Sequence, residues 1–378
     1  MKTYDLYTHY KKILVDTITP VSIYLKIRDK YPNSILLESS DYHANNNSFS
    51  YICFNPIASI KVENESISQT FPDGSTLSKS ITDTTNVTDE IHQFTKRFKV
   101  NSDTDFKFIN NGIFGYIAYD AVRYFEDIDI SKKKDALSIP DIYYAVYQNI
   151  IAINHFKNEA YIFAHCFEND NNIEVIDHLI KVKNYASYGF NTAGDIDSNL
   201  TDAEYKNHVE LAKKHCARGD VFQLVLSKNF SQEFKGDEFN VYRALRSINP
   251  SPYLFYFDYG AFKIFGSSPE AQLIVDDGLA EIHPIAGTFR RSGNDLEDAK
   301  LAEKLVTDDK ENAEHVMLVD LARNDLSRHG SDVVVEKYRE VQFFSHVIHL
   351  VSKVVGNIDK HSSTMQVVAD TFPAGTLS

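Results

Sequence analysis

Residues 142–167 constrain the fold of this chain more than any other segment. The sequence IYYAVYQNIIAINHFKNEAYIFAHCF contains two aromatic and β-branched runs separated by the polar break NHFKNE. Such runs suit a pleated, half-buried surface, and a short polar break between them is typical of an antiparallel hairpin. The sequence therefore predicts a strand-rich core filled with aromatic rings, in keeping with 22 Tyr, 25 Phe and no Trp.

The rest of the chain repeats this pattern, with helices between the strands. Strands are expected at 34–60 (two, around the turn HANNN), 221–230, 253–268, 332–343 and 347–355, and around DGLAEIHPIAGTF. Helices are expected near 88–98, at 201–218, at 241–248 and from about 295 to 321. The helix at 201–218 begins with a capping-box pair, Thr201 and Glu204. Hairpins with interleaved helices indicate an α+β fold rather than a doubly wound parallel sheet.

The length of 378 residues predicts two domains, or one large fold made of two interlocked halves. The small, polar stretch NTAGDIDSNLT at 191–201 marks the boundary, so we predict an N-terminal half, 1–190, and a C-terminal half, 201–378. The last residues, TFPAGTLS, form a Gly/Pro turn without a polar tail. From this we expect a truncated chain.

Charge and composition exclude several classes of protein. Asp and Glu number 53 against 39 Lys and Arg, and the net charge of −14 repels phosphate backbones and anionic membrane surfaces, so neither nucleic acid nor a membrane is an expected partner. The three cysteines are too few and too widely spaced for a disulfide framework or a zinc site. The sequence contains no secretory signal. It also contains no apolar run as long as the roughly 20 residues that a membrane helix needs. We expect a cytoplasmic protein.

Two strand ends in the C-terminal half carry candidate functional residues. Glu270 follows the small residues GSSP and would be a general acid if it lined a pocket, although a glutamate after a strand is more often a solvated loop residue. The strand PIAGT ends at Gly287 and Thr288, whose backbone N–H groups and hydroxyl would hold a carboxylate, although an ordinary turn explains the same letters.

The segment KENAEHVMLVDLARND at 310–325 places Glu311 and Glu314 on one helix face. Carboxylate oxygens are the ligands that Mg²⁺ prefers, but a solvated acidic face remains an equal alternative. In SHVIHLVSKV, His346 and His349 lie on opposite faces of a predicted strand, and periodicity does not decide which one points inward.

Taken together, these stretches resemble the chorismate-utilising enzymes, and among them most closely the large subunits of anthranilate synthases. The resemblance covers nearly the whole chain, through many long motifs in the same order. They are LLESS at 36–40, GYIAYD at 115–120, GDVFQLVLSKNF at 219–230, NPSPYLFYF at 249–257, GSSPE at 266–270, HPIAGTFRR at 283–291, AEHVMLVDLARNDLSR at 313–328, IHLVSKVVG at 348–356 and FPAGTL at 372–377.

The resemblance implies an anthranilate-synthase-type fold, with antiparallel sheets from two interlocked halves and helices packed outside. It also implies a lyase that converts chorismate and ammonia to anthranilate and pyruvate in tryptophan biosynthesis. By position, Glu270 would protonate the departing C4 hydroxyl, and Glu314 with Glu311 would hold Mg²⁺. His349 would assist pyruvate elimination. Gly287 and Thr288 would contact the ring carboxylate or the metal, and Thr376 would help to hold the substrate.

Two positions distinguish members of the family. Members that add water at C2 typically have Lys where this chain has Gln223, and typical aminodeoxychorismate synthases have Lys at the position of Ala286. With neither Lys present, ammonia is the natural nucleophile and the anthranilate branch is favoured. No amidotransferase nucleophile elbow is present, so the resemblance implies a separate glutamine amidotransferase subunit as partner.

The N-terminal half resembles the family's feedback site for the inhibitor tryptophan. The residues implied in that site are Glu38, Ser39, Pro252, Tyr253 and Leu254. The basic residue that family members often have near Ser48 or Phe49 is absent. In the family GTLS continues through further residues that complete the active site, so we expect this chain to be a fragment lacking part of that site. The alternatives are an aminodeoxychorismate synthase component and a non-catalytic tryptophan-binding remnant.

Overall fold

The computed structural model describes residues 2–39, 48–128, 130, 138–168, 170–221, 223–344, 346–359 and 362–375. Its strands are β1 Tyr4–Leu14, β2 Ile35–Glu38, β3 Phe49–Glu63, β4 Ser66–Thr70, β5 Thr76–Ser80, β6 Phe98–Asn101, β7 Ile113–Ile117, β8 Ile142–Asn154, β9 Glu159–Cys166, β10 Phe190–Ser198, β11 Phe230–Gly236, β12 Tyr253–Asp258, β13 Lys263–Ser268, β14 Ile274–Asp276, β15 Leu279–Ile282, β16 Ile285–Arg290, β17 Gly330–Phe343 and β18 Val347–Ile358. Its helices are α1 Pro20–Ile27, α2 Val87–Thr95, α3 Ile173–Lys181, α4 Asp202–Arg218, α5 Phe239–Ile248, α6 Asp295–Thr307, α7 Asp309–Ser327 and α8 Thr364–Asp370, with a 3₁₀ turn, η1, at Tyr119–Tyr124. Within these ranges no helix is long and apolar enough to cross a membrane.

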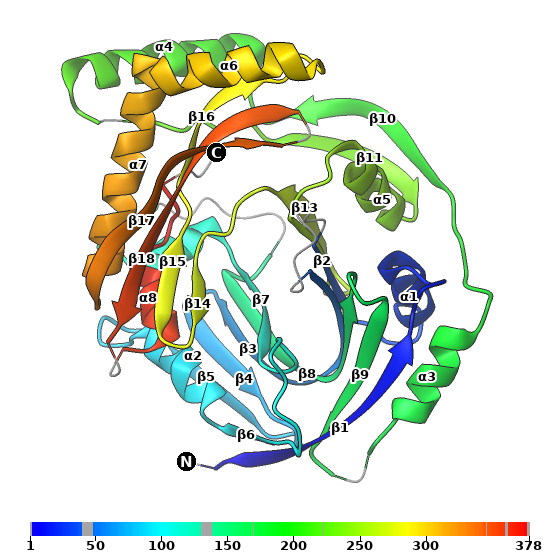
Figure 1. The fold of residues 1–378 in the computed structure, drawn as a ribbon. Helices are drawn as coiled ribbons and strands as arrows, with labels where there is room; N and C mark the ends of the chain where they lie inside the picture. The colour runs from blue at the N-terminus through cyan, green and yellow to red at the C-terminus, as the bar shows by residue number, and fades with distance from the viewer. Residues whose placement is uncertain are drawn as a thin grey trace.

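A large curved sheet contains most of the strands, in the order β13-β12-β2-β3-β8-β9-β1-β6, with β4, β5 and β7 attached (Figure 1). Neighbouring strands run antiparallel, as in β3 with β8, except that β1 and β6 are parallel. Because β12 pairs with β2 and places Leu254 opposite Glu38, the second half of the sequence supplies strands to the sheet of the first half. The predicted α+β class with interlocked halves is confirmed.

A smaller sheet has the order β14-β15-β18-β16, with β17 on the other side of β18. The helices α6 and α7 pack against it, as the upper left of Figure 1 shows. Leu305 of α6 is buried against Ile348 and Leu350 of β18, and α7 buries Val319 and other apolar side chains against the same strand. This packing holds the acidic helix α7 beside the strand end at Gly287.

Aromatic rings fill much of the core, as the composition predicted. On one face of the large sheet, α1, α3 and α5 cover a cluster that contains Tyr24, Phe239 and Tyr256. Another cluster of the same sheet contains Tyr147 and Phe163, and no helical residue is among its buried members in the described part of the chain.

Three segments differ from the sequence prediction. The polar stretch 191–201 is largely strand β10, which pairs with β11 as a two-stranded ribbon. The predicted strand 221–230 is wrong, because none of the described residues 221 and 223–229 is in a strand and β11 begins only at Phe230. The single helix expected from 295 to 321 is two helices, because Asp308 accepts hydrogen bonds from the N–H groups of Lys310 and Glu311 and so begins α7.

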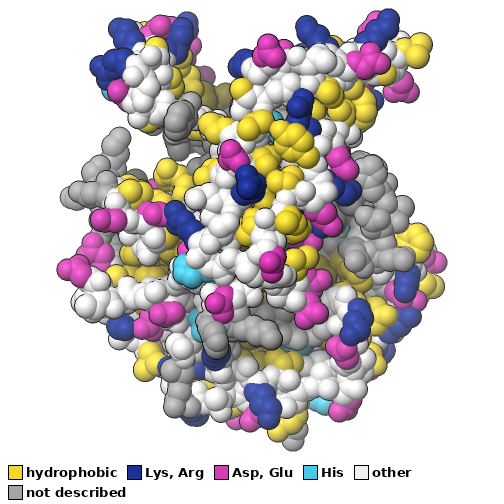
Figure 2. Space-filling model, turned by 60° about the vertical axis from the view of Figure 1, so that its left-hand side comes forward, with side chains coloured by type: hydrophobic (Ala, Val, Ile, Leu, Met, Phe, Trp, Pro, Cys, Tyr) yellow, Lys and Arg dark blue, Asp and Glu magenta, His cyan; other side chains and the backbone are white. Residues whose placement is uncertain are grey.

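The upper part of the molecule leaves apolar side chains exposed. Figure 2 shows them gathered below two projections of the surface. Helix α4 has its predicted cap, since Thr201 Oγ1 accepts from the amide of Glu204, yet none of its residues is buried. Its apolar face lies beside Leu224 and Leu226 in an open groove.

Candidate active site

The strand end at Gly287 is built by a local irregularity of β16. Its pairing with β18 shifts register between Ala286 and Thr288, and Gly287 has φ +79°. A Cβ at Gly287 would come within 3.4 Å of Glu311 Cβ in α7, so the absent side chain lets the helix approach. The shift frees the amide of Thr288 from the ladder, and it donates to Glu311 Oε2 at 3.0 Å.

A second contact joins this strand end to β18. The Thr288 hydroxyl lies 3.0 Å from His349 Nδ1, and the Gly287 carbonyl lies 3.4 Å from the same nitrogen. His349 also makes an edge contact with the ring of Phe344, and burial lowers the pKa of its imidazole. The structure therefore brings together Gly287, Thr288, Glu311 and His349, four of the candidate residues named from the sequence. His346 precedes β18 and instead faces the carbonyl of Ile248.

The two carboxylates of α7 offer hard oxygen ligands. Glu311 is largely buried, and Glu314, one turn further along, is half-buried. Within the described part of the chain, the Glu314 side chain makes no hydrogen bond or ion pair, and no group of three or more His, Cys, Asp or Glu is arranged to hold a metal. Mg²⁺ is commonly held by one or two carboxylates with water and substrate oxygens completing the shell, so this donor pair fits it.

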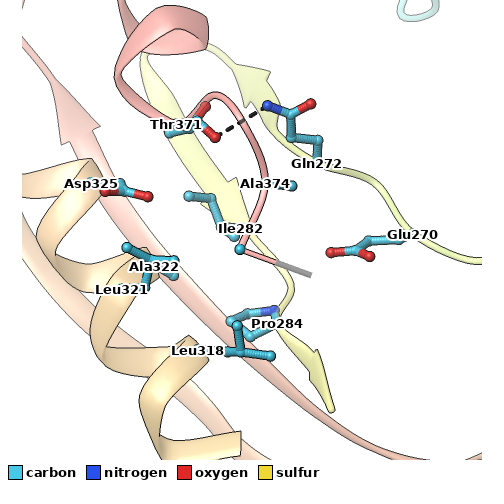
Figure 3. Close-up of a pocket in the computed structure, with 11 residues that line it drawn as sticks. Glu270, Gln272, Ile282, Pro284, Leu318, Leu321, Ala322, Asp325, Thr371 and Ala374 are labelled. Carbon is cyan, nitrogen blue, oxygen red and sulfur yellow. Dashed lines mark hydrogen bonds between the residues drawn. The ribbon is translucent and has the colours of Figure 1, made fainter. Parts of the chain in front are cut away.

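Glu270 lines a different part of the same region. It follows β13, and its backbone N–H donates to Ser268 Oγ. Figure 3 shows its carboxylate at an open hollow between β15, α7 and residues 371–375. Pro284, just before β16, and Leu318 of α7 also line the hollow. Thr288, Glu311, Glu314 and His349 are not among its lining residues.

The hollow depends on a close approach of the chain at Gly375. A Cβ at Gly375 would lie 2.4 Å from Leu321 Cδ2, so a side chain at this position would require the end of Leu321 in α7 to shift. The amide of Gln272 donates to the carbonyl of Thr371 at 3.2 Å and holds the segment in place (Figure 3). Thr376, the predicted substrate residue, lies outside the described residues.

Asp325 is a lining residue that the sequence analysis missed. Burial raises the pKa of its carboxyl to about 6, although Arg328 opposes that shift. It lies near the C-terminal end of α7, and only the fold shows that it shares a hollow with Glu270. Gln223, by contrast, is exposed in an irregular segment and is not part of this hollow.

The second predicted site surrounds Glu38, at the end of β2. This side chain is only 5% exposed, and its Oε2 accepts from the Tyr242 hydroxyl at 2.7 Å and lies 2.9 Å from Arg246 Nε. Its Oε1 is buried and has no hydrogen-bond partner in the described structure. A buried carboxylate oxygen without a donor is costly, so this atom is suited to a cationic ligand group.

The other predicted residues of this site differ in exposure. Ser39 and Pro252 are half-buried, and Tyr253 is exposed. Leu254 is buried in the core beside Tyr242 and Tyr256. Tyr242 and Arg246 were missed, although their spacing of four on the predicted helix 241–248 places them on one face.

This antiparallel α+β architecture places two acids and a threonine–histidine pair at the end of one strand. Residues 33–378 match the chorismate binding enzyme family, and the chain belongs to that family. The predicted family resemblance is confirmed.

Two of the similar proteins are anthranilate synthase components. The chain is 34% identical over 394 residues to anthranilate synthase component 1 of Aquifex aeolicus, covering 100% of this chain and 78% of that protein. It is 28% identical, with a TM-score of 0.74, to the crystal structure of anthranilate synthase component I from Streptococcus pneumoniae, covering 97% of this chain and 80% of that one. The predicted fold type is thereby confirmed, and the aminodeoxychorismate alternative is not favoured.

The fold also extends to more distant enzymes. The menaquinone-specific isochorismate synthase of Escherichia coli is 15% identical, with a TM-score of 0.68, and covers 97% of this chain and 74% of that one. At that identity the likeness shows the fold alone.

Proposed function

We propose that the chain is the synthase component of an anthranilate synthase, a Mg²⁺-dependent lyase of tryptophan biosynthesis in the cytoplasm. It converts chorismate and ammonia to anthranilate and pyruvate, and a partner glutamine amidotransferase supplies the ammonia. The observation that carries the proposal is the contact of Thr288 with both Glu311 and His349, which joins three motifs that lie far apart in the sequence.

The roles follow from chemistry and position. Glu311 and Glu314 are the residues that would hold Mg²⁺, which when bound neutralises carboxylate charge on the substrate. Glu270, at the hollow, donates a proton to the departing C4 hydroxyl. Thr288 and Gly287 orient the ring carboxylate, and the neutral imidazole of His349 accepts or donates a proton during pyruvate elimination. Thr376 helps to hold the substrate. Since neither Gln223 nor Ala286 is Lys, ammonia remains the expected nucleophile.

The test is anthranilate formation, followed by its fluorescence, from chorismate, Mg²⁺ and ammonium at mildly alkaline pH. Because the chain matches 78% of the Aquifex aeolicus protein, it is assayed both as it stands and extended to the length of its relatives. Anthranilate with an equal amount of pyruvate is the expected product. Production of 4-amino-4-deoxychorismate without pyruvate, or no product from either form, would contradict the proposal.

Glu314→Gln is the sharpest variant for the metal role. It keeps the size of the side chain but removes the charge that attracts Mg²⁺, so Mg²⁺-dependent turnover should be abolished. Glu336→Gln, a change to an exposed carboxylate that pairs with Lys353, is the matched control and should leave turnover intact. Equal turnover of Glu314→Gln and the wild type would refute the metal assignment.

Feedback by tryptophan is the second part of the proposal. The α-ammonium group would donate to Glu38 Oε1, the buried oxygen that has no donor among the described residues. Glu38→Gln should weaken tryptophan binding, measured by titration calorimetry, at least tenfold, because a charge-assisted hydrogen bond becomes a neutral one. Unchanged affinity would show that the ammonium group binds elsewhere.

A further inference from the structure

His315 is a wholly buried polar residue in α7 that the proposed chemistry does not use. It is 0% exposed and lies one helical turn after Glu311 and next to Glu314. Its Nε2 is 2.6 Å from the hydroxyl of Ser352 in β18, a serine that is itself only 1% exposed. A buried imidazole costs free energy unless it is hydrogen-bonded, so this contact fixes how α7 sits on β18.

Ser352 also contacts two further pieces of the small sheet. Its amide donates to the carbonyl of Pro284, the residue before β16, at 3.1 Å. Its hydroxyl oxygen accepts from the amide of Arg339 in β17 at 2.9 Å. A hydroxyl has one proton and two lone pairs, so Ser352 can accept from Arg339 and still form a hydrogen bond with His315 Nε2, as donor or as acceptor according to the tautomer of the imidazole.

The Arg339 contact occurs at a bulge. Lys337 pairs with Lys353 and Glu340 pairs with Val351, so two residues of β17 lie opposite Ser352 alone. Arg339 has φ +59°, a conformation that costs a non-glycine residue about 1 kcal/mol or more. The bulge, the serine and the histidine therefore form one connected unit between α7 and the sheet.

This unit lies directly beside the proposed metal site. The Cβ of Glu311 would be 3.4 Å from a Cβ on Gly287, so the helix and strand end are in van der Waals contact. The amide of Thr288 donates to Glu311 Oε2 only while α7 and β16 keep this relative position. A helix that rotated or slid by a fraction of a turn would move both carboxylates away from the strand end.

We infer that His315 is a positioning residue, which through Ser352 sets the register between the carboxylates of α7 and the strand end Ala286–Thr288. Its connection to Mg²⁺ rests on the proposed function. Its effect on the Thr288 amide does not, because that contact exists without metal or substrate.

The test compares His315→Gln, His315→Leu and Ser352→Ala in the full chain. The terminal amide of Gln lies where Nε2 of His does, so His315→Gln keeps a partner for Ser352, whereas the other two variants lose the contact. We expect His315→Leu and Ser352→Ala to speed hydrogen exchange of the Thr288 amide about tenfold and to weaken Mg²⁺ binding, measured by titration calorimetry, about 10- to 100-fold. His315→Gln should stay within about threefold of the wild type in both.

Val319→Ala is the matched control, because Val319 is buried in the same helix but packs in the apolar cluster away from Ser352. It should lower stability without changing Mg²⁺ affinity. If His315→Leu does not fold, Ser352→Ala decides, since it removes only a hydroxyl. Wild-type exchange and Mg²⁺ affinity in Ser352→Ala, or an equal loss in His315→Gln, would overturn the inference. A wild-type chain that binds no Mg²⁺ would contradict the proposed function. Hydrogen exchange of the Thr288 amide would still test whether His315 positions the strand end.

Discussion

Asp325 gives the clearest pH dependence at the level of single residues. Burial raises its pKa to about 6, above the ordinary value of about 3.9, so the folded state holds the proton more tightly than the unfolded state. The resulting contribution to stability is present below about pH 4 and is lost as the pH rises to about 6. Asp325→Asn should therefore raise the free energy of unfolding at pH 8 by up to about 1 kcal/mol, after allowance for partial exposure, and change it little at pH 4. Urea unfolding at both pH values measures this, and an equal effect at both would contradict it.

Several individual residues of the candidate site could be identified from the sequence. Thr288, Glu311 and His349 could be named in advance because each occurs in a distinctive run of letters. Their mutual contacts could not, because these depend on a register shift in β16 and on the glycine that permits it. Tyr242 and Arg246 contact Glu38, and Asp325 shares a hollow with Glu270; these partners are distant in sequence, so only the fold shows them together.

The N-cap of α7 is the feature of a single helix whose contribution to stability can be predicted best. Asp308 separates α6 from α7, and its carboxylate accepts from the amides of Lys310 and Glu311 at 3.1 Å. Asp308→Ala should lower the free energy of unfolding by about 1 kcal/mol, the usual value of an N-cap. Asp308→Ser, which keeps a capping oxygen, should lose only a few tenths. Denaturant titration of the two variants tests this, and equal losses would show that the cap does not carry the effect.

Elements were predictable where local chemistry and tertiary packing agree. The hairpin at 142–167 appears as β8 and β9, and the helix at 201–218 appears as α4 with its capping box. The prediction of a strand at 221–230 was wrong, because residues with high β propensity form a strand only beside a partner strand. The described residues 221 and 223–229 have no partner strand. The prediction of a single helix at 295–321 was wrong, because the sequence does not distinguish an aspartate that caps a helix from one on a helix surface. Only the structure shows that Asp308 caps α7.

At the scale of the whole molecule, a buried ion pair ties the two sequence halves together. Arg28 at the end of α1 makes two hydrogen bonds to Asp237, just before α5, at 2.9 and 2.6 Å, and both side chains are at most 10% exposed. The guanidinium also lies over the ring of Phe239. Since α5 carries the residues that hold Glu38, this pair anchors the proposed tryptophan site as well as the fold.

Removing one partner of this pair should cost more than removing both. Arg28→Met leaves Asp237 buried without a counter-charge and should lower the free energy of unfolding by about 3–5 kcal/mol. The double variant Arg28→Met/Asp237→Leu leaves no buried charge and should recover much of that loss. Lys213→Met, which breaks an exposed pair with Glu210, is the control and should cost less than about 1 kcal/mol. Urea unfolding followed by circular dichroism measures all three. If Arg28→Met costs no more than Lys213→Met, the halves are held together by the shared sheet alone, through the pairing of β12 with β2.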